Sequence, residues 1–226
     1  QGRAAGGGAV RRLGDRGGGP LLSSARRSGS GSGSGSGSDV RVARALSILG
    51  HPALLMPGAV VWASIARNAP PSVLFTAASA SVFVALCVGV YSAVQVRAGR
   101  WAHVDASIPR ERGQLNLFLA LLLFGTAGAL WWSGQPRPVF LGLALGGGLV
   151  VVGHLLRRWL KVSLHAGFAV FAAGLSWPGP VAFGLLALAV GVCWSRLVLR
   201  RHTLADVMVG FVAGGVAGFG FHLCAA

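Results

Sequence analysis

Seven apolar runs, most of them joined by short loops, constrain this chain more than any other feature of its sequence. Of the 226 residues, 54% are hydrophobic and only 11% are charged, a composition typical of membrane helices rather than of a soluble domain. No strand-like alternation interrupts the runs, and the fifth is short for a span of about 20 residues. We therefore predict an all-α, polytopic transmembrane helix bundle with six or seven spans. The runs are 46–66, 72–95, 115–133, 138–156, 165–177, 180–195 and 205–224.

The N-terminal part differs in composition from the rest of the chain. Residues 1–44 are mostly Gly, Ser and Arg and include an alternating Ser-Gly repeat. Such a segment cannot bury an apolar core. We expect 1–44 to be a disordered, flexible tail and 45–226 to be one transmembrane domain.

The charge balance is strongly positive, with 20 basic and 5 acidic side chains and a net charge of +15. Nucleic-acid binding is one interpretation of such a balance, but the cations lie in the tail and the loops, where membrane proteins keep them. If all seven runs span, one membrane face carries only Arg67 and Arg137, so the positive-inside rule places the other face in the cytoplasm. Arginine-rich usage favours a bacterial plasma (inner) membrane, with the N-terminus and the basic face cytoplasmic, and no nucleic-acid partner. The basic face carries Arg97, Arg100, Arg110, Arg112, Arg157, Arg158, Lys161, Arg196, Arg200 and Arg201.

A histidine and a carboxylate stand out near the C-terminus. Asp206 is the only acidic side chain after Glu111, and it follows His202 by four residues, so on a helix the two share a face. A lone carboxylate in apolar sequence is costly unless it is paired, which favours a functional role. A structural pair at a helix start is the alternative for these two residues.

Two polar clusters flank the fifth and sixth runs, and a helical hairpin would bring both to one membrane face. The first contains Lys161 (the only lysine), Ser163 and His165, and the second extends from Ser195 to Asp206. Two histidines, a carboxylate and cations suit phosphoryl transfer, which needs a nucleophile, a proton donor and positive charge on the phosphate oxygens. Asp206 would accept a hydrogen bond from one nitrogen of His202, and the other nitrogen would attack phosphorus.

The second cluster resembles a motif of a known family, the type-2 phosphatidic acid phosphatases, which share their catalytic core with vanadium haloperoxidases. Their third motif, Ser-Arg-x5-His-x3-Asp, is matched without a gap, and their second motif, Pro-Ser-Gly-His, keeps its serine and histidine in 162–165. The resemblance covers about 154–224 and implies a metal-independent enzyme without cofactors. It implies these roles: His202 as nucleophile, Asp206 as its partner, His165 as general acid, and Arg196, Ser163 and Ser195 on the phosphate side.

The first motif of that family, Lys-x6-Arg-Pro, is missing from its usual place. We expect Lys161 to supply one cation locally, and Arg157, Arg158 or an arginine of the 96–114 loop to replace the other. This loop, either an interfacial helix or an ordered segment, contains Asp105 and Arg112 and is expected to lie over the site. The family usually has six spans and commonly faces its site away from the cytoplasm, whereas our topology places the site inside.

These observations predict an integral membrane phosphatase that hydrolyses a lipid or polyprenyl phosphate through a phosphohistidine intermediate. A lipid phosphotransferase would use the same residues and pass the phosphoryl group to another alcohol. A catalytically degenerate homologue that binds lipid phosphates or scaffolds a partner is the non-enzymatic alternative.

Overall fold

The computed structural model describes residues 37–104, 106 and 108–225, and these form helices joined by turns and loops, without a strand. The predicted all-α class is confirmed. In chain order the helices are α1 (Gly37–Leu49), α2 (Pro52–Ala66), α3 (Pro71–Arg97), α4 (Pro109–Trp132), α5 (Arg137–Leu155), the 3-10 turn η1 (Leu156–Arg158), α6 (Leu164–Leu175), α7 (Pro180–Val198) and α8 (Leu204–Ala225).

Proline determines where several of these helices begin. Pro52, Pro71, Pro109 and Pro180 each occupy the first residue of a helix. Proline is favoured there because the first N–H groups of a helix have no intrahelical partner and the ring already has a helical φ. The connections before these prolines therefore end where the helices begin.

The first apolar run is broken into α1 and α2, which meet at an angle of 54°. Gly50 lies at the break, where a Cβ atom would collide with Val192 of α7, so α1 and α2 turn where the chain passes closest to α7. Helix α1 already begins at Gly37, within the stretch expected to be tail. The remainder of the predicted tail, 1–36, lies outside the described residues.

Within the described residues, five helices are long and apolar enough to cross a membrane, and the bent α1–α2 pair makes a sixth candidate. The chain is therefore an integral membrane protein, and length and composition support five spans, or six if the bent pair is one span. A seventh span would require α6, which has only 12 residues. At about 1.5 Å per residue α6 is too short to cross the hydrocarbon layer.

Helix α6 lies at the centre of the fold and packs against α8, α7 and α2. Its contact with α8 depends on glycine: a Cβ on Gly214 would collide with the carbonyl of Gly167, and one on Gly210 with the carbonyl of Ser163. Small residues let two helices approach closely in lipid, where van der Waals contact drives association. The glycine-rich stretch of the last apolar run is thus a helix-packing surface.

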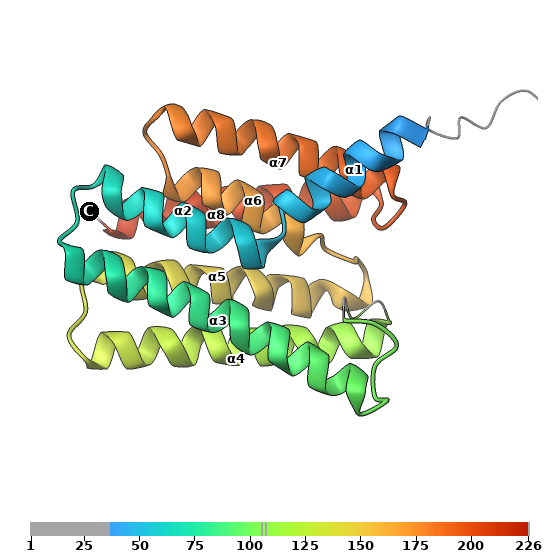
Figure 1. Cartoon of the computed structure of the whole chain (residues 1–226), viewed down its shortest axis with the longest axis horizontal. Coiled ribbons are helices and arrows are strands. Elements are labelled where there is room, and N and C mark those ends of the chain that lie inside the picture. The colour runs from blue at the N-terminus through green and yellow to red at the C-terminus, as the bar shows by residue number, and fades with distance from the viewer. Residues whose placement is uncertain (1–36, 105, 107, 226) are drawn as a thin grey trace, which may run out of the picture. The chain divides into compact units, whose positions relative to one another are not determined.

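Successive helices from α2 to α8 are antiparallel, so alternate connections lie at the same end of the bundle (Figure 1). The α3–α4, α5–α6 and α7–α8 connections share one end, and the basic residues that the sequence places on one face lie in these connections or in the helix turns next to them. The α3–α4 connection is ordered where it is described: Trp101 Nε1 donates to Gln114 Oε1 at 3.0 Å, and Ala102 N donates to Glu111 Oε1 at 2.9 Å. An ordered loop, rather than an interfacial helix, therefore joins α3 to α4.

We predict that Gly214→Ala lowers the stability of the protein, because the new methyl group pushes α6 and α8 apart. Overpacking of this kind costs about 1–3 kcal/mol. Thermal unfolding in detergent measures it as a lower Tm. Gly148→Ala is the control, because its Cβ has no atom within 4 Å, and its Tm should equal or exceed that of wild type. Equal Tm values for the two variants would contradict the packing assignment.

Candidate active site

The first turn of α8 is closed by a reciprocal pair of hydrogen bonds. Thr203 N donates to Asp206 Oδ2 at 2.8 Å, and Asp206 N donates to Thr203 Oγ1 at 3.2 Å. This is a capping box, which satisfies two backbone N–H groups at a helix start. The Thr-x-x-Asp spacing at 203–206 encodes it locally.

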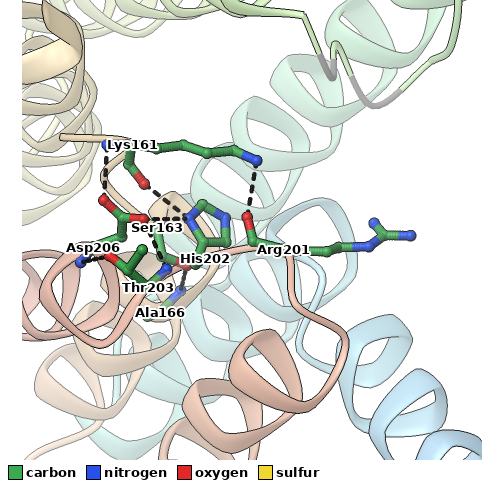
Figure 2. A network of polar contacts seen from close by, with 7 residues as sticks. All are labelled: Lys161, Ser163, Ala166, Arg201, His202, Thr203 and Asp206. Atoms are coloured by element: carbon green, nitrogen blue, oxygen red, sulfur yellow. Dashed lines mark hydrogen bonds and ion pairs between the residues drawn. The ribbon is translucent and has the colours of Figure 1, made fainter.

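The same turn holds the segment that leads into α6. Lys161 N donates to Asp206 Oδ1 at 2.8 Å, and Ser163 N donates to the backbone oxygen of Asp206 at 3.0 Å. Figure 2 shows the Asp206 carboxylate between Lys161 and Thr203. The two polar clusters of the sequence therefore meet, as predicted, and backbone N–H groups of both bind the one carboxylate.

His202 is oriented by a backbone carbonyl rather than by Asp206. Its Nδ1 lies 2.8 Å from Lys161 O and 3.9 Å from Asp206 Oδ2, so the predicted direct hydrogen bond to the carboxylate is wrong. Both carboxylate oxygens already accept backbone N–H groups. A carbonyl oxygen only accepts, so Nδ1 carries the proton and Nε2 of the neutral ring keeps its lone pair.

Cations surround this turn. Arg196, buried in the last turn of α7, donates from Nη1 to Ser47 Oγ at 2.9 Å, and Lys161 Nζ donates to Arg201 O at 2.8 Å. The charges that act on Lys161 are those of Arg112, Arg196 and Arg201 against Asp206 alone. Such an excess of positive charge favours an anionic ligand.

His165, the second residue of α6, contacts a second histidine. Its ring centroid lies 5.0 Å from that of His51, with the rings nearly perpendicular. His51 also caps α2 by accepting a hydrogen bond from Ala53 N at 3.2 Å. His51, His165 and Arg196 contribute to the wall of a partly open cavity of about 680 Å³, whose other walls come mainly from apolar side chains of α2 to α6.

The hydroxyl groups expected to bind phosphate have local partners instead. Ser195 is fully buried and its Oγ donates to Val192 O at 2.7 Å within α7. Ser163, also fully buried, caps α6 by accepting from Ala166 N at 3.5 Å. Both hydroxyls therefore have local partners within their helices, and phosphate contact by Ser163 and Ser195 stays a prediction.

The candidate replacements for the missing motif are distributed unevenly. Arg112, at the start of α4, acts electrostatically on both Lys161 and Asp206. Arg157 instead donates to His154 O at 2.8 Å at the end of α5, and Arg158 is exposed. Asp105 lies outside the described residues. Among Arg112, Arg157 and Arg158, Arg112 is therefore the arginine that interacts electrostatically with Lys161 and Asp206.

Burial and neighbouring cations lower the pKa values of the two histidines and of Lys161. Burial, followed by Arg196, lowers the pKa of His202 to about 4. Burial, Arg112 and Arg196 lower the pKa of Lys161. His165 lies outside the six candidate spans, and burial followed by Arg196 lowers its pKa as well. Both imidazoles are thus neutral near pH 7.

Three residues of this region were not identified as site residues from sequence. His51 is the N-cap residue of α2, and its contact with His165 depends on the α1–α2 break. Ser47 lies on α1 and Asn116 on α4, and neither belongs to a recognisable motif. Both are polar side chains inside apolar runs, and such residues usually face the bundle interior. This position was the only sequence feature that could have indicated a role for Ser47 and Asn116.

We predict that acid destabilises the protein partly through His202. An unfolded histidine binds a proton near pH 6.5, whereas the folded site resists protonation until about pH 4. Between these values the unfolded chain binds more protons, so stability falls as the pH falls through this window. Tm measured in detergent from neutral pH down to about pH 4 should fall more steeply for wild type than for His202→Gln. Parallel curves would contradict the assignment.

Comparison with known proteins gives one partial similarity. A segment of 95 residues is 30% identical to the phospho-N-acetylmuramoyl-pentapeptide-transferase of Gemmatimonas aurantiaca, and it covers 40% of this chain and 25% of that protein. The chain thus spans a quarter of the length of this curated relative. No protein-family model matches the chain, and no solved structure matches it.

Proposed function

We propose that this integral membrane protein is an enzyme that hydrolyses a lipid or polyprenyl phosphate, with His202 as the nucleophile. One observation carries the proposal: the Nδ1 proton of His202 is bound by Lys161 O, which leaves Nε2 free to react beside several cations. The neutral state that burial imposes on His202 favours nucleophilic attack, because only the unprotonated nitrogen is nucleophilic.

The reaction takes two steps. In the first, His202 Nε2 attacks phosphorus, and the N–P bond forms as the bond to the lipid oxygen breaks. The ring then carries positive charge, which Lys161 O and the carboxylate of Asp206 stabilise from the Nδ1 side. In the second, water attacks phosphorus, the N–P bond breaks, and inorganic phosphate leaves with His202 restored.

His165 serves as the proton donor to the lipid oxygen and then takes a proton from the attacking water. It needs a proton to begin, although burial and Arg196 disfavour one in the empty site. A phosphate dianion supplies negative charge where cations now dominate, and this raises the pKa of a neighbouring imidazole. Substrate binding therefore favours protonation of His165, which then donates this proton in the first step.

Arg196, Lys161 and Arg112 provide the positive charge for the phosphate oxygens. Arg196 is fixed by burial and by Ser47, so it needs little reorganisation during the reaction. This arrangement fits the resemblance to the type-2 phosphatidic acid phosphatases. No family model matches the chain, so the resemblance rests on the motif residues alone. Lys161 and Arg112 take the place of the absent first motif.

Transfer to another alcohol instead of water is the second candidate, favoured by the name of the partial relative, a transferase. The two reactions share the phosphohistidine and differ in what attacks it. Hydrolysis releases inorganic phosphate in proportion to substrate consumed. Transfer releases less and yields a phosphorylated acceptor.

The basic end of the bundle is proposed to face the cytoplasm. Cysteine at position 158 (Arg158→Cys) and at position 133 (Ser133→Cys), each in a chain whose three cysteines are replaced by alanine, would lie on opposite sides. In intact cells an impermeant thiol reagent should label position 133 and leave position 158 protected. The reverse pattern would place the site outside.

The catalytic assignment is tested by phosphate release from a panel of lipid phosphates. His202→Ala should lower kcat by at least about a thousandfold because the nucleophile is lost. His165→Ala should lower it by about 10²–10⁴-fold, the usual contribution of a general acid. Rapid acid-free quenching with radiolabelled substrate should trap an acid-labile, base-stable phosphoenzyme in wild type but not in His202→Ala.

His103→Ala is the control, because His103 is exposed in the α3–α4 loop. It should retain wild-type activity and the phosphoenzyme. Equal phosphate release by wild type, His202→Ala and His165→Ala would show that the chemistry lies elsewhere.

A further inference from the structure

A cavity of about 680 Å³ lies inside the bundle, and its walls suit a hydrocarbon chain. This volume falls within the roughly 300–1,000 Å³ typical of ligand pockets. Met56 and Val60 of α2, Leu119 and Leu123 of α4, and Phe168 and Phe171 of α6 contribute apolar surface.

Small side chains on one face of α3 leave this space open. The lining residues of α3 recur at helical spacing, so they occupy a single face, and several of them are alanine, glycine or serine. Helix α3 packs chiefly against α2, and no large α3 side chain fills the gap. The small lining residues are Ala77, Ala80, Ser81, Ala85, Gly89 and Ser92.

One end of the cavity is polar and cationic. Arg196 is 6% exposed, and His51 and His165 meet there edge to face. Asn116, 5% exposed, lines the same cavity and adds a polar amide to its wall.

The opposite end contains another cation, Arg67, whose polar contacts are made within the protein. Its Nη1 donates to Ala63 O at 2.9 Å, and its guanidinium lies 5.3 Å from the centroid of Phe221. The anionic head of a ligand is therefore expected beside Arg196. His165 and Arg196 belong both to this cavity and to the charged cluster near His202, whereas His202 does not line the cavity.

We propose that the cavity binds the hydrocarbon chain of a single-chain lipid phosphate, with the phosphate beside Arg196, His165 and His51 and the chain directed towards Phe221. This inference rests on the proposed function and names its substrate class. A longer chain fills more of the cavity and makes more van der Waals contacts with its walls, so affinity should increase with chain length.

The test compares two phenylalanine variants on neighbouring residues of α3. Ala80 is buried and lines the cavity, whereas Ser79 is exposed and does not line it. The measured quantity is the ratio of kcat/KM for hexadecyl phosphate to that for butyl phosphate. Ala80→Phe should lower this ratio by at least about tenfold because the ring fills the space for the longer chain, and Ser79→Phe should keep the wild-type ratio.

A binding measurement separates this inference from the catalytic proposal. Hexadecyl phosphonate, which cannot be hydrolysed, should raise the Tm of wild type and Ser79→Phe more than butyl phosphonate does. Ala80→Phe, or Ala80→Leu if the larger ring prevents folding, should lose this difference. An unchanged chain-length preference in both substituted Ala80 variants overturns the cavity assignment, as does an equal loss in Ser79→Phe. Chain-dependent binding without phosphate release by wild type would instead support the cavity and contradict the proposed function.

Discussion

The carboxylate of Asp206 is the point on which the candidate site depends. It closes the first turn of α8 through Thr203 and binds the backbone of Lys161, so two segments distant in sequence share one anion. Lys161 in turn orients His202 through its carbonyl oxygen. Asp206 therefore acts on the imidazole through the chain it holds in place, and its charge at 3.9 Å adds a weaker direct stabilisation.

This arrangement requires α6 and α8 to lie very close together. Glycine at 167, 210 and 214 removes the side chains that would keep the helices apart, and the approach brings the 161–163 segment within hydrogen-bond distance of α8. The same bundle leaves a cavity along α3, where small residues face inward. Helix α6 thus packs closely against α8 on one side and lines the cavity on the other. The polar residues of the site lie beside this apolar cavity.

Helix positions and the convergence of the two polar clusters could be predicted from sequence because both follow from local periodicity and from antiparallel connection. The break at Gly50 could not, since it depends on contact with α7 rather than on the apolar run itself. The partner of His202 was also predicted incorrectly, because His-x3-Asp spacing shows which residues share a helix face but not which backbone groups occupy the carboxylate. Ser163 and Ser195 match motif positions, yet burial gives their hydroxyls local partners.

The cavity could not be predicted from the sequence, because its walls come from several helices that are distant along the chain.

Nitrogen NMR of protein with isotope-labelled histidine, assigned by comparison with His202→Gln, reports the protonation state of the proposed nucleophile. At neutral pH and without ligand, His202 should be neutral, with its proton on Nδ1 and no proton on Nε2. A proton on Nε2, or on both nitrogens, would contradict it.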